Sequence, residues 1–174
     1  MKPVYSIGFV LLLALFAACD RGPALLPGTE LPLASFSENG VTVEIVLQLT
    51  TGGETILAAT FIPEQGWHLY SMDLISDSVG RPTLLEIPAS AQMQAAGELT
   101  ESVAAAPFSS DDGELLVYPQ GPVTLSIVVI LPSGSVWIDD QVLVTYMACS
   151  DSACRAPVVG RLVPLRVPGM GLLP

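Results

Sequence analysis

The chain has 174 residues and a formal net charge of −11, with 51% hydrophobic and only 13% charged residues. This length is sufficient for one domain whose hydrophobic core needs no disulfide or metal in order to fold. The acidic balance argues against nucleic acid and anionic lipid surfaces as partners.

The first segment is typical of a secretory signal. The apolar run Ile7 to Ala18 follows Lys2 and is too short to span a bilayer. It ends in LFAAC (15–19), which is similar to a bacterial lipobox with Phe where Leu is usual. We expect residues 1–18 to be a lipoprotein signal peptide and Cys19 to be lipidated; the alternative is an ordinary secretory signal with an incidental cysteine.

These features predict a protein on the extracytoplasmic (periplasmic) face of a bacterial membrane, held by a lipid anchor. Asp20 directly after the anchor cysteine favours the inner membrane. Cleavage would remove Lys2, the only lysine, and leave five arginines against 17 acidic residues, a formal charge of −12. Outside the cytoplasm a disulfide can form and persist.

The predicted elements follow in chain order. Residues 19–35 are rich in Pro and Gly and lack periodicity, so we expect a flexible tether with a reach of about 20–25 Å. We expect the domain itself over 36–168 and a short Pro/Gly tail over 169–174. Alternating apolar and polar residues predict a clear strand at Val41–Leu49. Further strands are expected at 55–62, 67–72, 83–87, 114–118, 123–131, 141–149 and 160–167.

Regularly spaced strands with turns between them predict an all-β fold, an immunoglobulin-like antiparallel β-sandwich. The only helix-like window, Ala89 to Ala106, lacks an apolar stripe. Asp139 and Asp140 are predicted to lie in a turn before the strand that leads to the cysteines.

Cys149 and Cys154 enclose a small polar loop, and three interpretations of the pair are open. A closed zinc site needs four ligands, and the chain adds only His68, so we expect no metal and no cofactor. A disulfide across this hairpin would close a loop of about six residues and stabilise the fold by only roughly 2 kcal/mol. A redox pair would use the exposure of a hairpin tip, where Arg155 would favour a thiolate and Asp151 would oppose it.

The segment VTYMACSDSACRAP (144–157) resembles the active-site hairpin of the N-terminal periplasmic domain of the thiol:disulfide interchange protein DsbD family. That hairpin has a strand ending in Tyr, a Cys, an Asp-containing loop, a second Cys and proline. The corresponding residues here are Tyr146, Cys149, Asp151, Cys154 and Pro157. PEQGWHLYS (63–71), RPTLLEI (81–87) and LLVYPQGPVTLSIVVIL (115–131) extend the similarity over about 36–167.

The resemblance implies an immunoglobulin-like fold and a thiol:disulfide exchange domain that passes reducing equivalents to partner proteins. It implies that Cys149 and Cys154 cycle between dithiol and disulfide, with Cys154 attacking the partner and Cys149 resolving the mixed disulfide. The implied partners are thioredoxin-like or disulfide isomerase-type proteins. The family continues into a membrane domain and a thioredoxin-like domain, so a chain ending at Pro174 would need a separate membrane thiol-transport protein as its electron donor.

Departures from the family pattern concern the residues around the cysteines. Arg155 and Ala156 precede the single Pro157, and the cap region over 106–114 has Phe108 as its only aromatic residue. Tyr70 is a further candidate beside the cysteines, whereas His68 is expected to be an ordinary packed or surface histidine. The competing hypothesis is a non-catalytic envelope binding or scaffold module in which the Cys149–Cys154 disulfide is structural.

Overall fold

The computed structural model describes residues 26–74, 79–110 and 113–174. This part of the chain contains strands and one short 3-10 helix, η1, at Met170–Leu172. No helix in it is long and apolar enough to cross a membrane. The signal peptide, Cys19 and Asp20 lie outside the described residues, so these predictions stay predictions.

The larger sheet is antiparallel and runs in the order β1-β2-β3-β10-β6, with β7 also paired to β10. Its strands are β1 (Thr29–Glu38), β2 (Val41–Leu49), β3 (Thr55–Pro63), β6 (Gln94–Ala95), β7 (Thr100–Glu101) and β10 (Val123–Ile130). The facing sheet has the order β13-β11-β5, also antiparallel. Its strands are β5 (Leu84–Glu86), β11 (Trp137–Tyr146) and β13 (Val158–Pro168).

The core lies between these two sheets because inward and outward residues alternate along their strands. On β2, Val43, Ile45 and Leu47 are fully buried, whereas Glu44 between them is exposed. Val142 and Val144 of β11 contribute to the same core from the other sheet. Two facing antiparallel sheets with one apolar interior confirm the predicted immunoglobulin-like β-sandwich.

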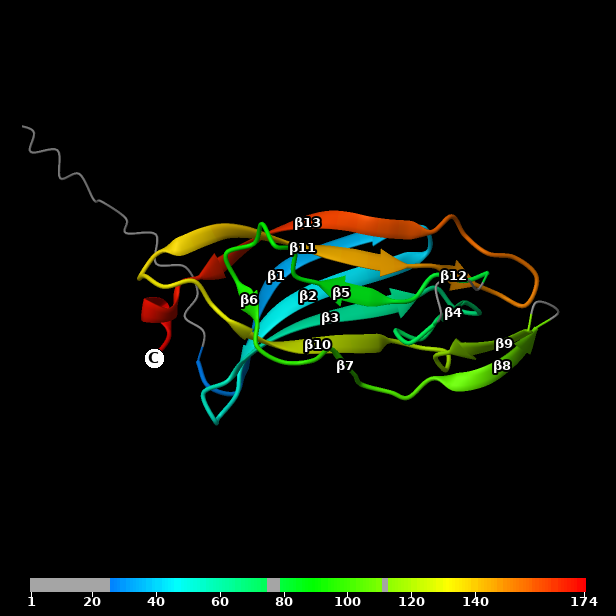
Figure 1. The fold of residues 1–174 in the computed structure, drawn as a ribbon, viewed down its shortest axis with the longest axis horizontal. Helices are drawn as coiled ribbons and strands as arrows, with labels where there is room; N and C mark the ends of the chain where they lie inside the picture. The colour runs from blue at the N-terminus through cyan, green and yellow to red at the C-terminus, as the bar shows by residue number, and fades with distance from the viewer. Residues whose placement is uncertain (1–25, 75–78, 111–112) are drawn as a thin grey trace, which may run out of the picture.

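Two small strand pairs extend one end of the sandwich. They are β12 (Ala148–Cys149) with β4 (His68–Leu69), and β8 (Ala106–Ser110) with β9 (Gly113–Val117). Figure 1 shows both pairs at the end of the long axis opposite to the C-terminus and to the start of β1. The cysteines therefore lie far from both ends of the described chain.

The tether predicted over 19–35 is wrong from Thr29 onward, because residues 29–35 belong to β1. β1 pairs with β2 along its whole length, with an irregularity between Pro32 and Ala34. Proline is tolerated there because β1 is the edge strand of its sheet and needs no second partner. The composition of the segment concealed the strand, since Pro and Gly are also the residues of flexible linkers.

Asp139 and Asp140 do not form the predicted turn but lie inside β11. Asp140 is buried, and its carboxylate accepts hydrogen bonds from the backbone N–H groups of Gln92 (3.1 Å) and Met93 (2.8 Å). These bonds hold the start of the 89–106 segment, which contains no helix and whose strands β6 and β7 pair with β10. The carboxylate thus accepts backbone hydrogen bonds that a neighbouring strand would otherwise accept, in a segment with little regular structure.

We predict that Asp140→Ala lowers the free energy of unfolding by about 2–3 kcal/mol, because it removes the carboxylate that accepts hydrogen bonds from the N–H groups of Gln92, Met93 and Gln141. Urea denaturation measures the change. The matched control is Asp139→Ala, whose side chain is exposed and whose effect should stay within about 0.5 kcal/mol. Equal effects of the two variants would contradict the assignment.

Candidate functional site: the cysteine hairpin

Cys149 and Cys154 face each other across a four-residue loop and form a disulfide, with 4.0 Å between their Cα atoms. The backbone bonds flank the pair: Ser150 N–H donates to Ala153 O (2.8 Å), and Arg155 N–H donates to Ala148 O (2.9 Å). The two cysteines are therefore a non-hydrogen-bonded pair, the position at which facing side chains of an antiparallel ladder approach most closely.

The loop between the cysteines is shaped by the Ser150 hydroxyl. This oxygen accepts the N–H groups of Ser152 (3.4 Å) and Ala153 (3.2 Å) and donates to the Ala153 carbonyl (3.2 Å). The backbone and Ser150 thus hold the turn independently of the disulfide.

The two sulfur-bearing residues differ sharply in exposure. Cys149 is only 2% exposed and packs with Tyr70, Leu115 and Met147 in a small cluster apart from the main core. Cys154 is exposed. An incoming thiolate can reach the Cys154 side of the bond, whereas protein surrounds Cys149.

A cleft of about 520 Å³ opens beside the disulfide. The β4 segment, the β8–β9 hairpin and the cysteine loop supply most of its walls. The lining side chains outside the cysteine loop are His68, Tyr70, Val79, Phe108, Ser109 and Leu115. The predicted cap region thus forms a β-hairpin, and it brings Phe108 to the cysteines.

His68 occupies the position directly opposite Cys149, because β4 and β12 pair in that register. Its ring lies 5.7 Å from the Tyr70 ring and 5.6 Å from the Phe108 ring, centroid to centroid. Burial lowers the pKa of His68 from its ordinary value of 6.5, and the negative charge of Asp151 opposes this shift. Burial raises the pKa of Tyr70, which keeps its proton.

Arg155 follows Cys154 but does not line the cleft. Its guanidinium lies 4.5 Å from the centre of the Trp67 ring and forms an ion pair with Glu64 at 2.9 Å. The positive charge is directed toward Glu64 and Trp67, and it is screened because both charged partners are exposed. The expectation that Arg155 favours the thiolate gains no support from this position.

Tyr146 and Pro157 also lie outside the cleft. Tyr146 is fully buried in the main core, with its ring 5.7 Å from that of Phe61. Burial raises the pKa of Tyr146 to about 12, so its hydroxyl acts only as a neutral donor, to the Glu38 carbonyl at 3.1 Å. Pro157 is exposed in the segment that links Cys154 to β13.

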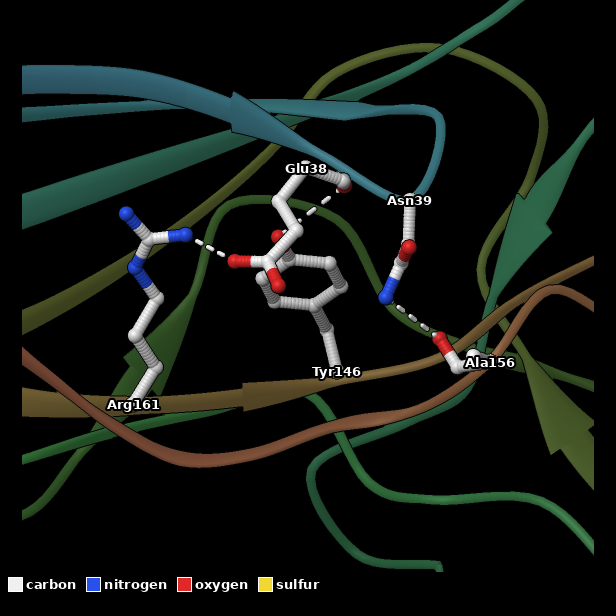
Figure 2. Close-up of polar contacts among 5 residues, drawn as sticks. All are labelled: Glu38, Asn39, Tyr146, Ala156 and Arg161. Atoms are coloured by element: carbon white, nitrogen blue, oxygen red, sulfur yellow. Dashed lines mark hydrogen bonds and ion pairs between the residues drawn. The ribbon is translucent and has the colours of Figure 1, made fainter.

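The turn between β1 and β2 contacts the segment that links Cys154 to β13 (Figure 2). Asn39 and Gly40 both have positive φ, 49° and 76°, the backbone of a type I′ hairpin turn. The Asn39 amide donates to the Ala156 carbonyl at 2.9 Å, and the Glu38 carboxylate pairs with Arg161 of β13. A turn more than a hundred residues away thus anchors the chain just after Cys154.

Sequence reasoning therefore identified the cysteines, Asp151, Tyr70 and Phe108, all of which line the cleft. It missed His68 and Leu115 as neighbours. The pairing of β4 with β12 places His68 beside Cys149. The residues of these two short segments do not predict that they pair. In the described part of the chain, no three His, Cys, Asp or Glu side chains are grouped so that they could hold a metal.

No family model matches the chain, and no curated protein sequence does. Among solved structures, it is similar to the N-terminal domain of DsbD from Neisseria meningitidis in its reduced form. The TM-score is 0.42 and the sequence identity 13%, over 80% of this chain and 85% of that chain. At this level of similarity, membership of the DsbD family stays a prediction from the cysteine hairpin.

We predict that His68 titrates below 6.5 and that Asp151→Asn lowers its pKa further, because the variant removes the charge that favours the imidazolium. NMR titration of the single imidazole measures both values. As pH falls, His68 takes up its proton in the unfolded chain at a higher pH than in the folded chain. The stability that the neutral histidine contributes is therefore complete above pH 6.5 and is lost as pH falls through the folded-state pKa. Asp139→Asn, distant on β11, is the control and should leave the titration unchanged.

We predict that Asn39→Gly lowers the free energy of unfolding by about 1 kcal/mol, since it keeps the positive φ but loses the bond to Ala156. Asn39→Ala should cost roughly 1 kcal/mol more, because it also strains the left-handed backbone. Chemical denaturation of the oxidised protein compares the two. Identical stabilities of both variants and the parent would show that the turn does not anchor the segment.

Proposed function

We propose that the chain is an extracytoplasmic thiol:disulfide exchange domain that passes reducing equivalents to partner proteins through Cys149 and Cys154. The observation that carries this proposal is the unequal disulfide: one residue is exposed at a hairpin tip, the other is buried, and a cleft opens beside them. Exposed disulfides are the ones that exchange, whereas structural ones resist reduction.

The exchange proceeds in two displacements. In the dithiol form the Cys154 thiolate attacks one sulfur of the partner disulfide, and the partner's other sulfur leaves as a thiolate. Cys149 then attacks the Cys154 sulfur of the mixed disulfide, and the second partner sulfur leaves. The Cys149–Cys154 bond is now formed, and the partner has gained two electrons. A separate thiol donor returns the pair to the dithiol by the reverse sequence.

The cleft supports a protein rather than a small thiol as the partner. Phe108, Leu115 and Val79 give it an apolar wall next to the disulfide, with Phe108 and Val79 themselves 37% and 54% exposed. The proposed partner is a thioredoxin-like or disulfide isomerase-type protein, and apolar side chains around its reactive cysteine would suit such a wall. The electron donor in this proposal is a membrane thiol-transport protein.

The layout of the sandwich supports a membrane tether at the proposed lipid anchor. β1 begins at Thr29, at the end of the molecule opposite to the cysteine hairpin, and runs toward the turn that contacts Ala156. Ten residues of strand span about 30 Å. A lipidated Cys19 would therefore hold one end of the domain at the membrane and present the cysteines at the other.

A structural disulfide is the rival interpretation, and the hairpin itself weakens it. The Ser150 hydroxyl and two backbone bonds already hold the loop. The disulfide closes a loop of about six residues and joins no two layers of the sandwich, so its stabilisation is only roughly 2 kcal/mol.

The proposal predicts unequal reactivity of the two cysteines. A thioredoxin that keeps only its exposed cysteine, loaded as a thionitrobenzoate disulfide, is mixed with each reduced variant that keeps one of the two hairpin cysteines, in a chain whose Cys19 is replaced by Ser. Cys149→Ala retains the exposed Cys154 and should form the protein–protein disulfide at least about tenfold faster than Cys154→Ala, because access controls the attack. Released thionitrobenzoate and a non-reducing gel follow the reaction.

Equal rates for the two variants would contradict the assigned roles. The wild-type pair is also equilibrated with glutathione redox buffers. A reduction potential below about −300 mV would identify an inert structural disulfide and overturn the exchange function.

A further inference from the structure

We infer that His68 is the proton acceptor for the buried Cys149 thiol when this thiol resolves the mixed disulfide. This assignment rests on the proposed exchange function and names a residue for one of its steps. Three features of the site carry it: the register of His68, the burial of Cys149 and the lack of another suitable base in the described cleft.

The register places the imidazole at the right sulfur. His68 and Cys149 are directly paired residues of β4 and β12, so their side chains leave the ladder on the same face with Cβ atoms about 5 Å apart. Both side chains line the same cleft as Cys154. A proton can therefore pass between the imidazole and the thiol within the site.

The burial of Cys149 creates the need for a base. A thiol in apolar surroundings has a raised pKa, and only the thiolate is an effective nucleophile. Cys149 is 2% exposed among Tyr70, Leu115 and Met147, so bulk water has little access to it. Cys154 is exposed and can lose its proton to solvent, so the need is confined to the second displacement.

The other titratable side chains that face His68 are unsuited to this role. Among the described residues of the cleft these are Tyr70 from the β4 segment and Asp151 from the cysteine loop, while the β8–β9 hairpin contributes Phe108, Ser109 and Leu115. Tyr70 keeps its proton because burial raises its pKa. Asp151 is exposed at the tip of the loop, and its charge favours the imidazolium once the proton has been taken.

The second displacement couples one proton transfer to the exchange of one sulfur–sulfur bond. Cys149–SH loses its proton to neutral His68 as its sulfur bonds to the Cys154 sulfur, and the Cys154–partner bond breaks. The partner leaves as a thiolate, and the imidazolium returns its proton to solvent. In the reverse direction the imidazolium protonates Cys149 as it leaves the disulfide. Burial lowers the pKa of His68, which keeps the ring neutral and ready to accept at neutral pH.

The test separates the two displacements with Ellman's reagent under stopped flow. Reduced protein with an intact hairpin, in a chain whose Cys19 is replaced by Ser, should release thionitrobenzoate in two phases: a first phase from Cys154, and a second when Cys149 resolves the adduct. His68→Phe keeps an aromatic ring between Tyr70 and Phe108 but accepts no proton. We expect an unchanged first phase and a second phase roughly 10- to 100-fold slower at pH 7.

The pH profile distinguishes a base from a merely structural residue. The wild-type second phase should be flat from the His68 pKa upward and fall below it, whereas in His68→Phe it should rise about tenfold per pH unit with the thiolate fraction. His68→Gln, which also accepts no proton, should behave like His68→Phe. Asp151→Asn should keep the flat region and move its lower limb to lower pH; loss of the flat region would instead make Asp151 the base and overturn the assignment.

The exchange function and the role of His68 are contradicted by different results. Wild-type protein without a second phase would contradict the exchange function itself. A second phase that is present in wild type and unchanged in rate and pH profile in both His68 variants would overturn the role of His68 and leave the exchange function standing.

Discussion

Two very short strands, Ala148–Cys149 and His68–Leu69, pair at the end of the sandwich, and the cysteine site depends on this pairing. It places Cys149 against the small apolar cluster around Tyr70 and thereby buries one residue of the disulfide. The chain then turns through the loop held by Ser150, so that Cys154 emerges on the exposed side. A disulfide with one accessible and one protected end is the geometric consequence, and the order of the proposed displacements follows from it.

The electrostatics of the cleft depend on the titratable groups that line it and on the position of Arg155 outside it. Arg155 adjoins Cys154 in sequence, yet Trp67 and Glu64 hold its guanidinium outside the cleft. The titratable groups in the described walls are a histidine with a lowered pKa, a tyrosine with a raised pKa and the Asp151 carboxylate. The described lining of the cleft includes no arginine or lysine that would stabilise a thiolate by a fixed positive charge. Exposure, more than charge, then distinguishes the two sulfurs.

The anchoring of the hairpin connects the reactive end with the rest of the sandwich. The β1–β2 turn binds Ala156 through Asn39, and the hydroxyl of Tyr146 binds the Glu38 carbonyl from the core side (Figure 2). β1 therefore extends from the end of the molecule that would face a tether to the segment that follows Cys154. The domain can act as a rigid spacer, with the cysteine pair held about one strand length, roughly 30 Å, from the start of β1.

The sequence alone determined the fold class, because alternation such as that in Val41–Leu49 survives in the structure as alternating buried and exposed side chains. It also predicted that Cys149 and Cys154 face each other across a short hairpin loop, since facing residues of an antiparallel hairpin lie near disulfide distance. It wrongly predicted a tether over residues 29–35, because Pro and Gly suit both a linker and an edge strand. It wrongly predicted a turn at Asp140, because a buried carboxylate cannot be told from a turn residue until its backbone donors are known. Only the tertiary structure decided that His68 faces Cys149, that Arg155 turns away and that Asn39 holds Ala156. Each of these contacts joins segments about 80 or more residues apart, and local periodicity carries no information on such pairings.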